Sequence, residues 1–103
     1  MTLEPDVEAL FEFIGYRKGK IFEGYRPAHL VEENYLTTGI HNYYSREENC
    51  DCEVKGTITF ISPSEYPACI WVGKRVEMYE GKNLIGYATI IKIFNPILQK
   101  FNA

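Results

Sequence analysis

The stretch EGKNLIGYATIIKIF, residues 80–94, constrains the fold of this chain more than any other. Its first four residues combine glycine with polar side chains, which is typical of a hairpin loop. Residues 84–94 are then apolar at both alternating positions as far as Ile91. A run of this kind predicts a long β-strand that is covered on both sides, as a central strand is.

Shorter segments alternate in the way that half-buried strands do. In residues 7–14 and 54–61, every second residue is apolar or small. We place three further strands at residues 28–36, 40–44 and about 70–79. No amphipathic helical period exceeds one or two turns. Six strands with short connections predict an all-β fold, a six-stranded antiparallel closed β-barrel, because closure removes exposed sheet edges.

Length and charge bound the class of protein. We expect the 103 residues to form one domain, residues 1–103, with a single core. The net charge of −3 provides no overall basic field for nucleic acid. Three cysteines are too few for a secreted disulfide framework. With no signal-peptide pattern and no apolar run of about 20 residues, we expect a cytoplasmic protein without membrane contact.

The parity of the apolar residues also predicts the core. We expect small residues near the start of the last strand to let the barrel wall approach the side chains inside. The predicted core consists of Phe11, Phe13, Ile58, Phe60, Val72, Ile90 and one or both of Gly86 and Ala88.

Four motifs occur in a fixed order along the chain. They are GYRP at residues 24–27, TTG at 37–39, VKGTITFISP at 54–63, and EG-x-x-x-IG-x-A from residue 80. In this order and at this spacing, they resemble the C-terminal (third) β-barrel domain of elongation factor Tu, over about residues 7–94. The resemblance implies the same closed barrel, as a stand-alone domain without the GTPase domain.

The resemblance also implies where RNA would bind. In elongation factor Tu, this domain grips the acceptor and T stem of tRNA and also meets the GTPase domain and the exchange factor. The family's glutamine after Arg-Pro is replaced here by Ala28, which cannot hydrogen-bond RNA. The loop SREENCDCE at residues 45–53 adds four carboxylates, which repel phosphate. The tRNA contacts carried over are Lys18, Lys20, Thr38, Gly39, Glu80 and Gly81.

Few residues suggest catalytic or metal chemistry. Cys50 and Cys52 are closer in sequence than zinc ligands usually are and lack two further ligands, so we expect reduced, metal-free thiols. Cys69 with His29 or His41 would be a nucleophilic pair in principle, but the apolar neighbours of Cys69 favour a buried, inert thiol. Without a phosphate-binding loop, we expect no nucleotide, no cofactor and no enzymatic activity.

Two binding functions remain. The acidic charge, the acidic loop and the missing glutamine favour a non-catalytic module for a protein partner, as an inhibitor, an immunity-type protein or a GTPase-associated protein. The alternative is a translation-related module that binds tRNA or another RNA. Tyr66 and Trp71 would anchor a protein, whereas lysines, including Lys82, would contact RNA. Purely structural roles are also open. Glu80-Gly81 would form the hairpin loop, TTG would form a turn between two strands, and Trp71 would be a half-buried core residue.

Overall fold

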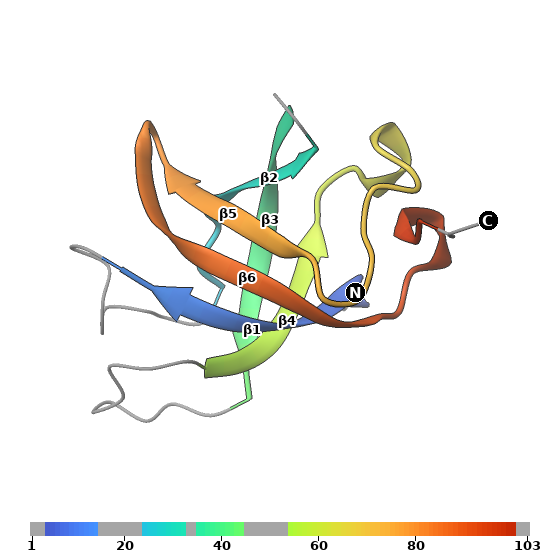
Figure 1. Ribbon diagram of the computed structural model, residues 1–103, viewed down its shortest axis with the longest axis horizontal. Coiled ribbons are helices and arrows are strands. Elements are labelled where there is room, and N and C mark those ends of the chain that lie inside the picture. Colours follow the sequence, from blue (N-terminus) through green and yellow to red (C-terminus); the bar gives the residue numbers. More distant parts are fainter. Residues whose placement is uncertain (1–3, 15–23, 33–34, 45–53, 101–103) are drawn as a thin grey trace.

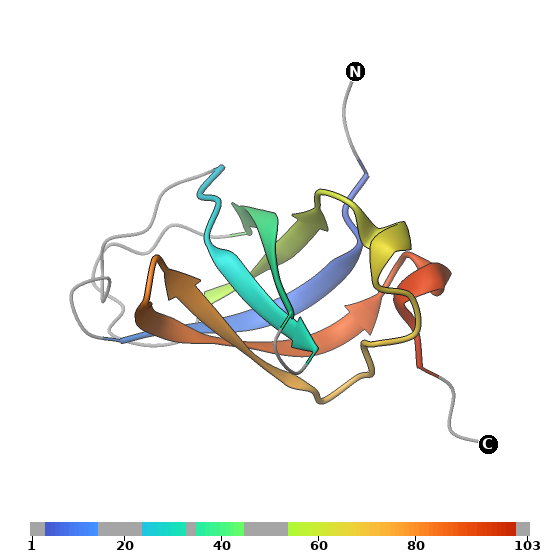
Figure 2. The same cartoon turned by 90° about the horizontal axis from the view of Figure 1, so that it is seen from above.

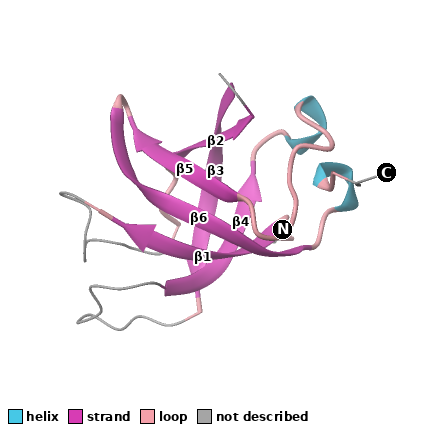
Figure 3. Ribbon diagram, viewed as in Figure 1, coloured by secondary structure: helices cyan, strands magenta, loops and turns pink. Residues whose placement is uncertain are grey.

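The computed structural model describes residues 4–14, 24–32, 35–44 and 54–100 of the chain. These residues form six strands and two short 3-10 helices (Figures 1 and 3). The elements are β1 (Val7–Phe13), β2 (Ala28–Glu32), β3 (Tyr35–Tyr43), β4 (Val54–Phe60), η2 (Pro63–Glu65), β5 (Arg75–Glu80), β6 (Asn83–Ile93) and η3 (Pro96–Leu98).

The strands close into a barrel. Each pairs antiparallel with both neighbours in the order β1-β4-β3-β2-β5-β6, and β6 returns to β1. This confirms the predicted all-β, six-stranded antiparallel closed barrel. The ladders differ in length: β1 and β6 align over seven pairs, whereas β2 and β5 align only at Ala28↔Tyr79 and His29↔Met78. We call this short ladder the β2–β5 seam.

The interior is filled by one face of each strand. Burial alternates strictly along β1, where every second residue is buried. The predicted core is confirmed at all positions but one, and both Gly86 and Ala88 are buried. The exception is Val72, which is 59% exposed because it lies in a turn before β5 and not in a strand.

The last strand is apolar on both parities because bulges change its inward face. Its ladder with β5 slips between Met78 and Tyr79, so that Ile85 is an extra residue and is fully buried. Its ladder with β1 slips between Glu8 and Ala9, which makes Ile91 the second extra residue. The prediction of a strand covered on two sides is therefore wrong: β6 has one interior face, whose parity the bulges reset.

Two glycines permit close contact between neighbouring strands. A Cβ on Gly86 would lie 2.0 Å from the carbonyl oxygen of Glu12 in β1, and one on Gly56 would lie 2.2 Å from that of Asn42 in β3. Gly86 therefore makes room for the backbone of a neighbouring strand, and not for interior side chains as predicted.

Three predicted strands have different bounds in the structure. The strand placed at residues 40–44 is the second half of β3 (Tyr35–Tyr43). The strand placed at residues 28–36 is divided, because β2 ends at Glu32 and β3 begins at Tyr35. The TTG motif lies inside β3, where Thr38 pairs with Ala28, and so it does not turn the chain. The strand placed at about residues 70–79 begins only at Arg75. The strands predicted at 7–14, 54–61 and 84–94 shift by a single residue at their ends.

Residues 61–74 and 94–100 cover one end of the barrel, which we call the capped end. Here η2 and η3 lie side by side in both views (Figures 1 and 2). The carboxylate of Asp6 holds this end to β4 and to the C-terminal segment, since it accepts hydrogen bonds from the Phe60 amide at 2.7 Å and from the Asn95 side chain at 2.8 Å.

Candidate functional site

Large apolar side chains are exposed chiefly at the capped end. Of nine exposed large hydrophobic residues in the described part of the chain, five belong to it. The ring of Tyr35, a sixth, packs against Tyr66 of the same end, with 5.4 Å between ring centres. The five residues are Ile61, Trp71, Val72, Phe94 and Ile97. Exposed apolar side chains at one end of a domain make that end a candidate interaction surface.

A tight turn presents Trp71 and Val72 to solvent. The amide of Lys74 donates to the carbonyl of Trp71 at 3.1 Å, and Gly73 between them has φ 95°, as the third position of a type II turn requires. The turn is held to β6, because the Gly73 amide donates to the Ile90 carbonyl at 2.7 Å. Trp71 is 42% exposed, so the turn holds a partly exposed indole in a defined position. We call residues 71–74 the Trp71 turn.

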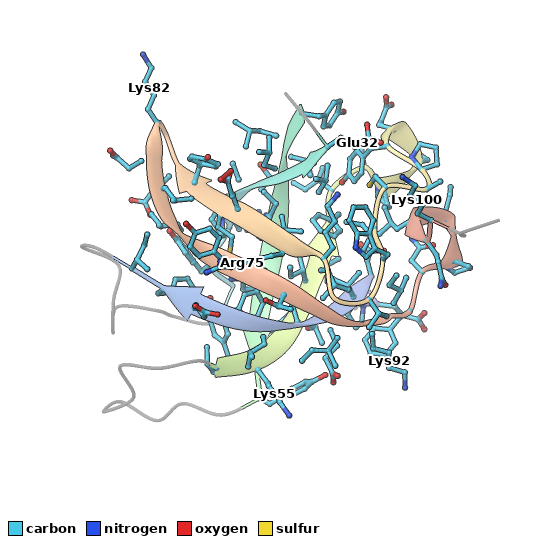
Figure 4. The ribbon with its side chains drawn as sticks, viewed as in Figure 1. Glu32, Lys55, Arg75, Lys82, Lys92 and Lys100 are labelled. Carbon is cyan, nitrogen blue, oxygen red and sulfur yellow. The ribbon has the colours of Figure 1, made fainter. Side chains whose placement is uncertain are left out.

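Two lysines lie over the indole of Trp71. The Nζ atoms of Lys74 and Lys100 are 4.6 Å and 5.5 Å from the ring centre, within the range of cation–π attraction. Lys74 also donates hydrogen bonds to the carbonyls of Val31, at the end of β2, and of Cys69, the latter at 2.7 Å. Burial lowers the pKa of Lys74. Lys74 therefore connects β2 to the Trp71 turn, whereas Lys100 is exposed (Figure 4).

The predicted site residues are not gathered in one place. Glu80, Gly81 and Lys82 belong to the β5–β6 hairpin, at the end of the barrel away from η3 in both views (Figures 1 and 2). Lys82 projects outward from that hairpin (Figure 4). Trp71 lies at the capped end. The carboxylate of Glu80 accepts a hydrogen bond from the Tyr25 hydroxyl.

Other predicted site residues are partly or wholly in the interior. Tyr66 is only 2% exposed and its hydroxyl accepts a hydrogen bond from Thr37 at 3.1 Å, so it is a core residue and not an exposed anchor. Gly39 is buried in β3, whereas Thr38 is half-buried. Lys18 and Lys20 lie outside the described residues, as do Cys50 and Cys52.

The cations of the described residues do not form one patch. Lys55, Arg75, Lys82, Lys92 and Lys100 project from different parts of the barrel (Figure 4). Arg75 is engaged by its neighbours: its guanidinium lies 3.7 Å from the ring centre of Tyr87 and 3.6 Å from the Glu12 carboxylate.

Sequence reasoning did not identify the polar cluster in the barrel interior. His29 of β2 and His41 of β3 are fully buried, and their Nε2 atoms are 2.8 Å apart. His41 Nδ1 is also 2.8 Å from the hydroxyl of Tyr43. Both histidines lie on the buried face of their strands, which His29 shares with Val31 and His41 shares with Tyr43. This parity could have identified both histidines as interior residues, but the prediction of the core considered only apolar side chains.

The two histidines are engaged with each other and not with a thiol. Cys69 is buried, as predicted, and its thiol donates to the carbonyl of Tyr66 at 3.0 Å. Burial raises the pKa of this thiol, which keeps it protonated and weakly nucleophilic. In the described residues no three His, Cys, Asp or Glu side chains are arranged to hold a metal ion.

No protein-family model, curated protein or solved structure matches this chain. Neither of the two short helices in the described part is long or apolar enough to cross a membrane.

Proposed function

We propose that this chain is a non-catalytic, cytoplasmic binding module that docks a protein partner through the capped end of its barrel. The observation that carries the proposal is the Trp71 turn, which holds a half-exposed tryptophan beside the still more exposed Val72. Tryptophan is among the residues that dominate protein interfaces, because a large rigid ring adds contact area at little cost in conformational entropy.

The charges near Trp71 favour a partner with carboxylates around an apolar contact. Because Lys74 and Lys100 lie over the ring, its electron-rich face is already engaged, and a partner cation would meet two ammonium groups. Lys74 is bound to two carbonyls, which leaves the exposed Lys100 to pair with a carboxylate. A partner segment of apolar and acidic side chains therefore fits this surface best.

The resemblance to the third domain of elongation factor Tu belongs to the same proposal. That domain meets other proteins of the translation machinery through a rigid barrel, and an inhibitor, an immunity-type protein or a GTPase-associated protein would use the scaffold in the same way. The motifs at residues 24–27, 37–39, 54–63 and 80–88 and the six-stranded closed barrel support this assignment.

The test begins by capturing partners of the full chain and identifying them by mass spectrometry. The Kd of the purified partner is then measured for Trp71→Ala and for Ile14→Ala. Ile14 is an exposed apolar residue just beyond β1, and its amide donates to the Ile85 carbonyl near the β5–β6 hairpin, away from the capped end. We expect Trp71→Ala to weaken binding by about 30-fold or more, as the loss of about 2 kcal/mol at a hot spot does, and Ile14→Ala to have little effect. Equal effects of the two variants would refute docking at the capped end.

RNA binding is the second candidate, and two ring contacts favour it. Lys74 and Lys100 lie over Trp71, and Lys92 lies 5.5 Å from the ring centre of Phe94. Aromatic rings with nearby cations are used to stack bases and hold phosphates. Micromolar tRNA binding that falls steeply with salt, and that is weakened both by Lys18→Ala with Lys20→Ala and by Trp71→Ala, would favour RNA over the protein partner.

A further inference from the structure

The β2–β5 seam is the weakest junction of the barrel. Its two pairs, Ala28↔Tyr79 and His29↔Met78, compare with four pairs between β2 and β3, the next shortest ladder. Beyond His29, the carbonyl of Val31 accepts a hydrogen bond from the side chain of Lys74, the last residue of the Trp71 turn before β5. Barrels open locally where the fewest backbone hydrogen bonds must break, which in this barrel is the seam.

His29 belongs to one of these two pairs, and its ring is held inside the barrel. The ring lies against Gly39, where a Cβ would come within 2.8 Å of His29 Cε1 and 2.6 Å of Ile58 Cγ2. Glycine at this position therefore lets the rings of His29 and His41 meet at 2.8 Å. One of the two Nε2 atoms must donate and the other accept, so the contact survives protonation of one ring and is lost only when both rings are protonated.

The surroundings of the pair disfavour a positive charge. Burial lowers the pKa of His29 to about 4, although the nearby carbonyls of Thr37 and Pro27 favour its protonated form without hydrogen-bonding its Nδ1. Burial and the neighbouring His29 hold the pKa of His41 well below its usual range. The groups packed around the two rings are Phe11 and Phe13 of β1, Ile58 and Phe60 of β4, Tyr43 of β3 and Tyr25 before β2.

Among the described residues, no carboxylate raises the pKa of either ring. The hydroxyls near the pair are those of Tyr43, which is 2.8 Å from His41 Nδ1, and of Tyr25, whose ring stands edge-on to His41. Glu80 of β5 is one step further away, because it binds the Tyr25 hydroxyl. Inside the closed barrel, a proton on His29 thus gains carbonyl dipoles and the contact with neutral His41, whereas it gains full hydration when the seam is open.

We propose that the His29–His41 pair is an acid-sensitive latch on the β2–β5 seam: protonation of His29 opens this seam while the other strand ladders stay paired. In the open seam, His29 is hydrated and its pKa returns towards 6.5, against about 4 in the closed barrel. The closed form is favoured above pH 6.5 and loses that advantage as the pH falls towards 4. Between pH 7 and pH 5, His29 alone shifts the equilibrium towards the open seam by about 20-fold.

Native-state hydrogen exchange of the full chain tests this proposal. Protection factors are measured by NMR at pH 7 and pH 5 in low concentrations of urea, for the amides of Ala28, His29, Met78 and Tyr79. We expect these amides to exchange through an opening with a small urea dependence, whose equilibrium constant rises by about 20-fold at pH 5. Amides of the long β1–β6 ladder should retain higher protection and show the larger urea dependence of global unfolding.

Equal protection and equal urea dependence in the two ladders would overturn the proposal, because the seam would then open only with the whole barrel. An opening that does not change with pH would overturn it as well. In His29→Gln, the pH dependence of the seam should disappear. If that variant does not fold, the imidazole NMR signals of the wild-type chain are titrated with pH. The chain has only two histidines, so these signals report the protonation of each one directly and can be compared with the opening of the seam.

Discussion

Truncation of Phe60 tests the parity on which the barrel interior depends. Phe60, the last residue of β4, is 4% exposed, and its ring stands edge-on to His29 and Tyr66 with centres 5.6 Å and 6.0 Å apart. Burial of a phenylalanine side chain contributes about 1.5–3 kcal/mol, and the cavity left by truncation adds to the loss. The two edge-on contacts contribute about 0.5–1.5 kcal/mol each. We therefore expect Phe60→Ala to lower the free energy of unfolding by about 3–5 kcal/mol.

The adjacent residue provides the control. Ile61 is 58% exposed, so Ile61→Ala should lower the free energy of unfolding by less than about 1 kcal/mol. Both variants are measured by urea denaturation, with the m-value checked to show that the extent of unfolding is unchanged. Because about 1 kcal/mol corresponds to about 4–8 °C for a domain of this size, the two Tm values should differ by more than about 10 °C. Equal losses in the two variants would refute the assigned parity of β4.

Further predictions concern pH, backbone contact and the Trp71 turn. Burial lowers the pKa of His29 to about 4, so below pH 6.5 the unfolded state binds more protons than the folded state. Through this residue alone, the free energy of unfolding measured by urea denaturation should fall by about 2 kcal/mol from pH 7 to pH 5. Gly86→Ala should destabilise the barrel by more than Gly81→Ala, since only the first would place a Cβ against a backbone oxygen, and their Tm values check the order. Lys74→Met should shift the fluorescence of Trp71, the only tryptophan, more than Lys100→Met does, because Lys74 lies nearer the ring and binds the carbonyls of Val31 and Cys69.

Alternation along single strands determined most of the predicted fold. In β1, one local period assigned the buried residues correctly. In β4 it did so for Ile58 and Phe60, but Thr57 and Thr59 of the opposite parity are buried as well. The same reasoning was wrong in β6, where Ile85 and Ile91 are bulge residues. A bulge depends on the partner strand, and so the period of the strand itself does not reveal it.

The bounds of β2 and β3 illustrate a second limit. TTG reads as a turn because glycine and threonine are common between strands. Here Gly39 is required in β3 by the ring of His29, which packs against it from the neighbouring strand. The sequence does not distinguish a glycine that makes room for a side chain of another strand from a glycine that turns the chain. Only the tertiary contact shows which role the glycine has.

The candidate site was predicted in part for a related reason. Trp71 was named and lies partly exposed in a rigid turn, but Tyr66, named with it, is buried. Both lie in the irregular segment between β4 and β5, where no period indicates which side chains point inward. Their burial depends on the parallel bridge of Ile70 with Gln99 and on the packing of η2 against η3, contacts between segments far apart in the sequence.

The histidine pair bears on function because we expect apolar residues at these two positions to give a barrel at least as stable. A buried polar pair replaced by apolar residues of similar volume is often neutral or stabilising, since the polar groups lose hydration on folding. The rings of Phe11 and Phe60 already pack against His41 and His29, so apolar residues would suit the same space. What histidine adds is a group that takes up a proton below about pH 6.5 when it is hydrated, placed at one of the two pairs that close the shortest ladder. Lys74 joins Val31 at that ladder to Cys69 beside the Trp71 turn, so a seam that opens with acid also loosens the support of the proposed docking surface.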